Sequence, residues 1–181
     1  MPLPTIQLYF LLIICISQSA YSQNTSQYTA SKFTSDDISQ FLDHHNKARG
    51  ELNLAPLKWN KNIAAYAQEW AEFLANKKKC KLMHRDALNK NPMDLGENLY
   101  WISSGENFQA VQAAVAWYSE KSFFNNQPFS YNMADKVGHY TQMIWSGTTE
   151  LGAGKATCPS GAVIIVANYN PMGNTIGQLA Y

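Results

Sequence analysis

The sequence predicts a single α+β domain in which helices flank a small antiparallel sheet. Apolar residues recur at helical spacing over three early stretches, and residues 151–157 and 162–170 are predicted as strands. A turn at residues 159–161 separates these strands, so they can pair as neighbours. The chain of 181 residues is long enough to bury one core, and it contains no internal repeat or low-complexity linker that would indicate a second domain.

The composition is that of a globular protein. Apolar residues make up 46% of the chain, and Gly and Pro are too sparse for a fibrous or disordered protein. The formal net charge of +1 gives no overall attraction to nucleic acid or to membranes, so any membrane contact must be local. We expect no nucleic-acid partner, and either a monomer or a weak dimer.

Residues 1–22 have the features of an export signal peptide. Residues 8–16 are an apolar run of suitable length, whereas a transmembrane helix needs roughly 20 apolar residues. Small residues at Ala20 and Ser22 predict cleavage just after them. An uncleaved anchor is the alternative, because no Lys or Arg precedes the apolar run. We therefore expect a secreted or periplasmic protein.

Removal of this signal leaves two cysteines, Cys80 and Cys158. In an exported protein two cysteines most simply form one disulfide. In the chain-entropy model, closing so long a loop stabilises the fold by about 4 kcal/mol. Two buried free thiols are the alternative, since a sequence does not show geometry.

The first helix is expected to follow a flexible polar lead-in at residues 23–33, which contains a glycosylation sequon at Asn24. Thr34 can cap this helix and acids occupy its first turn. We interpret His45 as a structural imidazole because it lies on the apolar stripe, and His44 as exposed. The stripe consists of Ile38, Phe41, Leu42, His45, Ala48 and Leu52.

The second helix is predicted at about residues 60–77 and ends in a basic segment. Lys77, Lys78 and Lys79 close it, and Lys81 and Arg85 follow. Basic residues favour the C-terminal end of a helix, so a solvated helix end is the simpler interpretation. Contact with anionic lipid headgroups is the alternative. The inner face is predicted to carry Ile63, Ala67, Trp70 and Leu74.

A third helix is predicted at residues 107–121, after a loop at 86–94 and an apolar stretch at 96–101. We expect Val111, Ala114, Val115 and Tyr118 to face inward. The loop that follows, residues 123–131, is unusually aromatic. It forms either a binding surface, as exposed aromatic clusters do, or simply part of the core.

Two histidines and two glutamates are the candidates for chemistry. His139 lies beside Gly138 in an aromatic cluster that can hold it in one orientation. His84 begins a loop, Glu97 precedes an apolar run, and Glu120 is near the end of the third helix. Buried carboxylates need partners such as imidazoles, and the four together could hold a metal ion, most readily zinc. The sequence has no His-Glu-x-x-His motif, nucleophile elbow, P-loop or dinucleotide-binding glycine motif.

Four sequence blocks add a family resemblance: residues 45–49 (HNKAR), 96–100 (GENLY), 138–145 (GHYTQMIW) and 168–174 (NYNPMGN). In this order they resemble the CAP superfamily of cysteine-rich secretory, antigen 5 and pathogenesis-related 1 proteins, over about residues 38–181. The resemblance implies an α-β-α sandwich with a central cleft, formed by residues 34–181.

The resemblance also implies roles for particular residues. The family's cleft tetrad falls on His84, Glu97, Glu120 and His139, and in related proteins the two histidines bind a divalent metal, often zinc. The family also pairs the cysteines at Cys80 and Cys158.

The chain departs from the family pattern at two places. A second family disulfide would link the positions of Ala153 and Ala167, where small apolar side chains can fill the core instead. Arg85 stands where relatives commonly carry serine after the cleft histidine.

Relatives of this type have been linked to sterol and fatty-acid binding, with the aromatic loop implicated for sterols. Here that loop supplies Phe123, Phe124, Pro128 and Phe129. We therefore expect an exported lipid-binding protein with a metal in its cleft. One alternative is a metal-dependent hydrolase or protease with Glu97 or Glu120 as base, although two ligands are fewer than hydrolytic zinc usually has. The other is a secreted effector in host interaction or defence.

Overall fold

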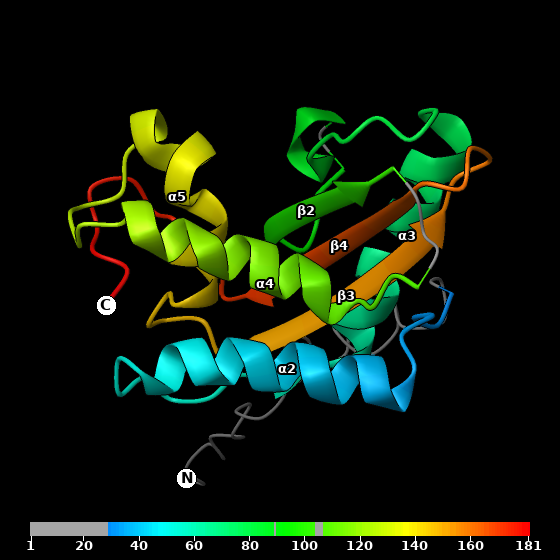
Figure 1. Cartoon of the computed structure of the whole chain (residues 1–181). Coiled ribbons are helices and arrows are strands. Elements are labelled where there is room, and N and C mark those ends of the chain that lie inside the picture. The colour runs from blue at the N-terminus through cyan, green and yellow to red at the C-terminus, as the bar shows by residue number, and fades with distance from the viewer. Residues whose placement is uncertain (1–28, 89, 104–106) are drawn as a thin grey trace, which may run out of the picture.

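The computed structural model describes residues 29–88, 90–103 and 107–181 (Figure 1). The predicted signal at residues 1–22 and the sequon at Asn24 lie outside these ranges. The elements, in order, are α2 (Ser35–Gly50), β1 (Lys58–Trp59), α3 (Lys61–Lys77), the 3-10 helix η1 (Arg85–Leu88), β2 (Gly96–Ile102), α4 (Val111–Ser119), the 3-10 helix η2 (Glu120–Phe123), α5 (Tyr131–Met143), β3 (Glu150–Thr157) and β4 (Val163–Asn170).

The sheet has the strand order β1-β3-β4-β2. Strand β4 pairs antiparallel with both β2 and β3, as predicted for neighbours joined by a turn. One edge departs from the predicted antiparallel arrangement, because β1 pairs parallel with β3. With only two residues, β1 is too short to leave a hydrophobic pattern in the sequence.

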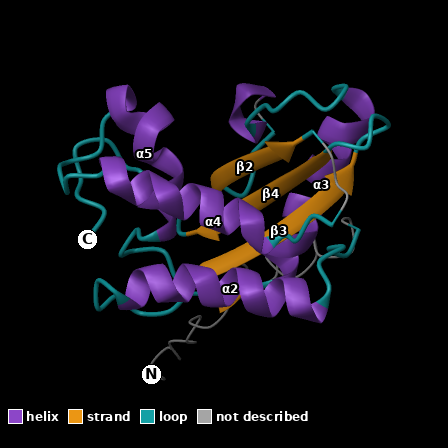
Figure 2. Ribbon diagram, viewed as in Figure 1, coloured by secondary structure: helices purple, strands orange, loops and turns teal. Residues whose placement is uncertain are grey.

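Helices cover both faces of this sheet, which confirms the predicted α-β-α sandwich. Alternate side chains of β4 face opposite sides. On one side Ile164 and Val166 pack with Trp70 of α3. On the other side Ile165 packs in the cluster that contains Trp117 of α4 and residues of α2. Figure 2 shows α2 and α4 running along one face of the strands and α3 on the other.

Helix α2 begins and is buried as predicted. Thr34 and Asp37 form a capping box at its N-terminus. Phe41, His45 and Ala48 are fully buried, which confirms the inner stripe and the structural interpretation of His45. His44, by contrast, is half-buried rather than exposed.

The lead-in predicted as flexible is packed at its described end. Phe33 is buried, and its ring packs edge-on against Phe41 with the ring centroids 5.4 Å apart. Ser31 donates through Oγ to the carbonyl of Ala153 at 2.6 Å. The prediction of a flexible lead-in is therefore wrong for residues 31–33. Across the described ranges, no helix combines the length and the apolar character needed to cross a membrane.

The third predicted helix is shorter than expected. Helix α4 ends at Ser119 and passes directly into η2, so Glu120 lies at the junction. Val115, predicted to face inward, is 47% exposed. Ala113, Ala114 and Trp117 form the buried face instead. The large ring of Trp117 sets the orientation of the helix, because burying it removes more apolar surface than burying Val115.

Helix α5 was not predicted, although it contains the cleft histidine. It begins at Tyr131 after Ser130, whose side chain makes no capping hydrogen bond. Gly138 and Thr141 inside it also have low helix propensity. Burial of Val137, Tyr140 and Met143 stabilises the helix, and this tertiary packing has no local sequence signal.

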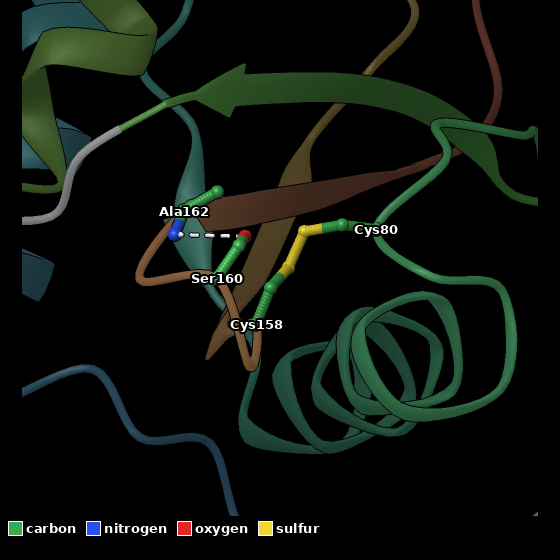
Figure 3. Close-up of a disulfide and its surroundings, with 4 residues drawn as sticks. All are labelled: Cys80, Cys158, Ser160 and Ala162. Atoms are coloured by element: carbon green, nitrogen blue, oxygen red, sulfur yellow. Dashed lines mark hydrogen bonds between the residues drawn. A yellow bond between two sulfur atoms is a disulfide. The ribbon is translucent and has the colours of Figure 1, made fainter.

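Cys80 and Cys158 form a disulfide with a Cα–Cα distance of 6.0 Å, which confirms the predicted pair (Figure 3). Figure 3 shows it joining the segment after α3 to the turn between β3 and β4, where the main-chain N–H of Ala162 donates to Ser160 Oγ. Ala153 and Ala167, the positions of the missing second bridge, are opposite each other in the β3–β4 register and are fully buried. They serve as core filler, as predicted.

Candidate functional site

The first half of the candidate cleft is a pair formed by His84 and Glu97. His84 lies just before η1, and Glu97 is on the edge strand β2. His84 Nδ1 is 3.0 Å from Glu97 Oε1, which also accepts the main-chain N–H of Arg85 at 3.0 Å. The hydrogen bond to Glu97 raises the pKa of His84 despite partial burial, and the charges of Glu97 and Asp86 add to the increase.

The second half pairs His139 of α5 with Glu120 of η2. His139 Nδ1 is 2.6 Å from Glu120 Oε1. Glu120 Oε2 accepts the main-chain N–H groups of His139 and Tyr140, each at 3.0 Å. The ring of Trp117 stacks on His139 with centroids 5.9 Å apart and an interplanar angle of 15°. His139 is therefore held by a carboxylate at its edge and an indole on its face.

The start of strand β2 lies between the two His–Glu pairs and contacts both of them. Side chains alternate along a strand, so Glu97 shares the α3 side of the sheet with Leu99, and Asn98 points to the opposite side. There Asn98 Nδ2 donates to the main-chain carbonyl of His139 at 3.1 Å. Each histidine is thus brought to one glutamate, and the two pairs approach β2 from opposite faces.

Each His–Glu pair leaves one imidazole nitrogen that could serve as a metal ligand. Both imidazoles use Nδ1 toward a carboxylate, which leaves Nε2 as the nitrogen for a metal, the usual carboxylate–histidine arrangement. Within the described ranges no group of three or more His, Cys, Asp or Glu side chains could hold a metal ion. Two imidazoles alone leave coordination positions for other ligands, and imidazole suits zinc.

The sequence alone did not predict the groups that support this cleft. Asn98 Nδ2 also donates to Tyr169 Oη at 3.1 Å, and Tyr169 Oη is 2.9 Å from His45 Nε2. His45 Nδ1 donates to the carbonyl of Phe41, so Tyr169 donates to Nε2 of a neutral ring. Trp117 had one usable signal, since it precedes Glu120 by three residues and therefore shares its helix face.

Arg49 is a further buried support that was not predicted. It is fully buried, and its guanidinium donates to the carbonyls of Ala55, Met143, Trp145 and Thr148 at 2.7–3.1 Å. These bonds hold the chain that leaves α5, and so fix the end of the helix that carries His139. The sequence marks Arg49 only by its position in the family block at residues 45–49, which does not indicate this role.

The aromatic loop after α4 divides between core and surface. Phe129 is 6% exposed and packs edge-on against Trp145. Phe124 is partly buried against the rings of Tyr140 and Tyr181. Phe123 is 69% exposed, and Pro128 is also exposed. Phe129 therefore belongs to the core, Phe124 packs at its edge, and Phe123 and Pro128 are exposed to solvent.

The C-terminal segment, residues 171–181, packs beside this loop (Figure 1). The N–H of Phe129 donates to the carbonyl of Gln178 at 2.8 Å, and the N–H of Gly177 to that of Phe129 at 2.9 Å. The segment exposes Ile176, Leu179 and Tyr181 to solvent. Exposed apolar side chains are thus present on both the loop and the segment.

A cavity of about 330 Å³ lies apart from the two His–Glu pairs. The ammonium groups of Lys32 and Lys155 border it. Lys32 pairs with Glu72 at 2.8 Å, and Lys155 pairs with Asp37 at 2.6 Å. The complete lining is Lys32, Phe108, Lys155, Ala156, Thr157 and Val163. It therefore combines cationic and apolar side chains.

Comparisons with known proteins agree with this architecture. The family model for the cysteine-rich secretory protein family, CAP, matches residues 42–169. Pathogenesis-related protein 1C of Nicotiana tabacum is 34% identical over 171 residues, which are 94% of this chain and 89% of the relative. Pathogenesis-related protein 1 of Arabidopsis thaliana is 37% identical over 147 residues, 81% of this chain and 83% of the relative.

Solved structures show the same fold. The structure of BmVAL-1 has a TM-score of 0.67 at 25% identity and covers 83% of this chain and 84% of its own. The crystal structure of NaASP2 with Zn²⁺ has a TM-score of 0.68 at 22% identity, with coverage of 82% and 86%. At that identity the likeness to NaASP2 concerns the fold alone.

Proposed function

The chain belongs to the CAP family of cysteine-rich secretory proteins, and we propose that it is an exported lipid-binding protein whose His/Glu cleft binds a divalent metal ion. Relatives named pathogenesis-related proteins support a role in defence outside the cell. The ligand class we propose is a sterol or a fatty acid. The metal we propose is zinc, because the donors are imidazoles.

The exposure of Phe123 is the observation that carries the lipid-binding proposal. A phenylalanine that is 69% exposed gains no stability from the core. Phe124 contacts Tyr181, which links the loop to the segment that exposes Ile176 and Leu179. Exposed apolar side chains on adjoining segments are typical of a binding surface for an apolar ligand.

Sterol titration of Phe123→Ala tests this surface. The variant should bind a sterol about tenfold more weakly, the loss expected of an aromatic contact at a binding hot spot. Its thermal stability should not change, because the ring makes little core contact. Val115→Ala is the matched control, since Val115 is an exposed apolar residue of α4. Equal sterol affinity of the wild type and Phe123→Ala would contradict the assignment.

The cavity beside Lys155 supports the fatty-acid form of the same proposal. Its volume of about 330 Å³ is at the lower end of ligand sites, and its ammonium groups suit a carboxylate. Salt screens the attraction between these ammonium groups and a ligand carboxylate, so binding should weaken as salt is added. Lys155→Met should lower fatty-acid affinity and leave sterol affinity unchanged. An unchanged fatty-acid affinity would exclude this cavity.

For the metal, we propose that His84 and His139 are the ligands and that Glu97 and Glu120 hold their rings. A bound zinc ion would supply Lewis acidity. Zinc titration by calorimetry should give one site per chain in the wild type. His139→Ala should abolish this binding, whereas His44→Ala, a change at a partly buried histidine outside the cleft, should retain it. Retention of zinc by His139→Ala would refute the assignment.

The hydrolase alternative depends on a glutamate that is free to act as a base. Glu120 instead accepts hydrogen bonds through both oxygens, and Glu97 contacts an imidazole and a main-chain N–H through Oε1, which suits an orienting role. Turnover of a substrate from an ester, peptide and phosphate panel, lost with chelator and in His139→Ala, would favour the enzyme instead. For the effector alternative, defence activity that survives His139→Ala would separate it from the metal.

A further inference from the structure

Arg85, the residue after His84, is buried although it carries a charge. It is 5% exposed, and its Nη2 donates to the carbonyl of Tyr66 at 2.8 Å and to Glu69 Oε2 at 2.6 Å. Its guanidinium carbon lies 3.7 Å from the centroid of the Tyr66 ring and 4.9 Å from that of Trp70. A buried charge is stable only with such partners. The side chain therefore fastens this part of the chain to α3.

The residue before His84 is fastened to the same helix. Trp70 Nε1 donates to the main-chain carbonyl of Met83 at 2.9 Å. His84 itself has a side chain that is 55% exposed, and its ring contacts Glu97. An exposed ring receives little support from packing, so its position depends on the main chain on either side. That main chain is held by Trp70 on one side and by Arg85 on the other.

Arg85 also reaches the partner of His84. Glu97 Oε1 accepts both the ring Nδ1 of His84 and the main-chain N–H of Arg85, each at 3.0 Å. A displacement of residue 85 would therefore change two hydrogen bonds to one oxygen atom. The imidazole of His84 and the main chain of Arg85 therefore share one carboxylate oxygen of Glu97.

We propose that Arg85 is a positioning residue of the cleft: its anchorage on α3 holds His84 and Glu97 in the arrangement that presents His84 Nε2 to a metal ion. The inference rests on the proposed metal-binding function. We expect lysine to replace the arginine poorly, because the guanidinium is planar and rigid and can stack on an aromatic ring while its fork donates in its own plane, whereas an ammonium group is a compact point charge on a flexible stem.

The test compares Arg85→Ser, Arg85→Lys and Glu69→Gln with the control Lys81→Ser in the full mature protein. Lys81 is an exposed lysine of the same segment, so the control removes one positive charge near the cleft. Zinc affinity is measured by calorimetry. The tautomer and order of each histidine ring are measured by NMR in the metal-free protein.

Arg85→Ser and Arg85→Lys should each bind zinc about tenfold to a hundredfold more weakly, the range expected when support for a metal ligand is lost. Glu69→Gln, at a partly exposed position that tolerates substitution, should show a smaller loss in the same direction. Lys81→Ser should stay within about twofold of the wild type, as expected for an exposed charge. In the metal-free spectra the Nδ1–H signal of His84 should broaden or shift in the arginine variants, and that of His139 should not.

Two results distinguish failure of the positioning role of Arg85 from failure of the proposed zinc binding. If the wild type binds no zinc, the metal proposal fails, and the spectra of His84 still decide the role of Arg85. The refuting result is an Arg85→Ser variant that folds, leaves the His84 ring signals unchanged and binds zinc within about twofold of the wild type. Such a small change is expected of a residue that does not support a metal ligand. Arg85 would then have only a structural role. If neither arginine variant folds, an unchanged His84 signal in Glu69→Gln refutes the inference equally.

Discussion

The two glutamates of the cleft hold their histidines in different ways. Both oxygens of Glu120 are engaged, one by His139 and the other by two main-chain N–H groups of α5. Glu97 uses one oxygen, and its Oε2 is buried with no hydrogen-bond partner in the part of the chain that the structure describes. The carboxylate of the His139 pair is therefore the more completely hydrogen-bonded of the two.

This difference predicts unequal costs for the two amide substitutions. Glu120→Gln places an amide N–H₂ against either an imidazole N–H or two main-chain donors, so it should lower the free energy of unfolding by about 2–3 kcal/mol. Glu97→Gln can turn its amide nitrogen toward the position of Oε2, where no donor opposes it, and should cost less. Urea unfolding at neutral pH measures both. A larger loss for Glu97→Gln would contradict the hydrogen-bond geometry.

The buried imidazole of His45 predicts a loss of stability in acid. Burial lowers its pKa from the ordinary 6.5 to about 3 in the folded protein. Between these values the unfolded chain binds the proton and the folded chain does not, so stability falls as pH drops below 6.5. At pH 5 the contribution of this residue amounts to a loss of about 2 kcal/mol.

The measurement is the free energy of unfolding at pH 5 and pH 7 for the wild type and for His45→Gln. The variant should be less stable at neutral pH and should lack this part of the pH dependence. Taking the difference between the two proteins removes the opposite contribution of His84, whose pKa is raised and which therefore stabilises the fold as pH falls. Parallel pH profiles of the two proteins would show that His45 does not titrate as proposed.

Strand β3 and helix α3 approach each other through backbone atoms. A Cβ atom built on Gly152 would collide with the main chain of Ala64, and one on Gly154 with the main chain of Gln68. The neighbouring atoms belong to a helix backbone and cannot turn aside as a long side chain can. The close contact of sheet and helix therefore depends on the absence of two side chains.

Gly152→Ala should consequently destabilise the protein by about 3 kcal/mol or more, since overpacking against rigid backbone cannot relax. Gly50→Ala is the matched control, because a Cβ there meets nothing within 4 Å. Gly50 is the last residue of α2, so its replacement should be neutral or slightly stabilising. Thermal unfolding of both variants measures the contrast. A mild effect at Gly152 would show that α3 can shift away from the sheet.

Sequence reasoning succeeded where an element has a local pattern. The stripe of α3 and the apolar run of β4 gave correct elements, because repeated burial leaves a period in the sequence. Helix α5 was missed because its stability comes from contacts with other elements. Strand β1 was missed because two residues have no period. Val115 was misassigned because Trp117, two positions later, determines the buried face.

The two His–Glu pairs were predicted in part for a similar reason. His84, Glu97, Glu120 and His139 were selected as residue types that need partners, and the pairing of each histidine with one glutamate follows that logic. Of the supporting contacts, only that of Trp117 has a signal in the sequence, its spacing of three residues from Glu120. Asn98 and Arg85 reach the pairs from separate elements, and no spacing in the sequence records their contacts. The contacts that support the two His–Glu pairs therefore form only when the whole chain folds.

The disulfide ties the segment that contains His84 to the β3–β4 turn. Cys80 precedes His84 by four residues, and Cys158 lies at that turn. The bridge spans 78 residues, so in the chain-entropy model its removal should lower the free energy of unfolding by about 4 kcal/mol. The double variant Cys80→Ser, Cys158→Ser tests this by urea unfolding. Trp70 and Arg85 still attach the segment to α3 in that variant. We therefore expect global stability to fall while the folded variant keeps its zinc affinity within about threefold. Loss of a residue that directly supports a metal ligand would instead weaken zinc binding about tenfold or more. A large loss of zinc affinity at full occupancy of the folded state would show that the disulfide, rather than α3, positions His84.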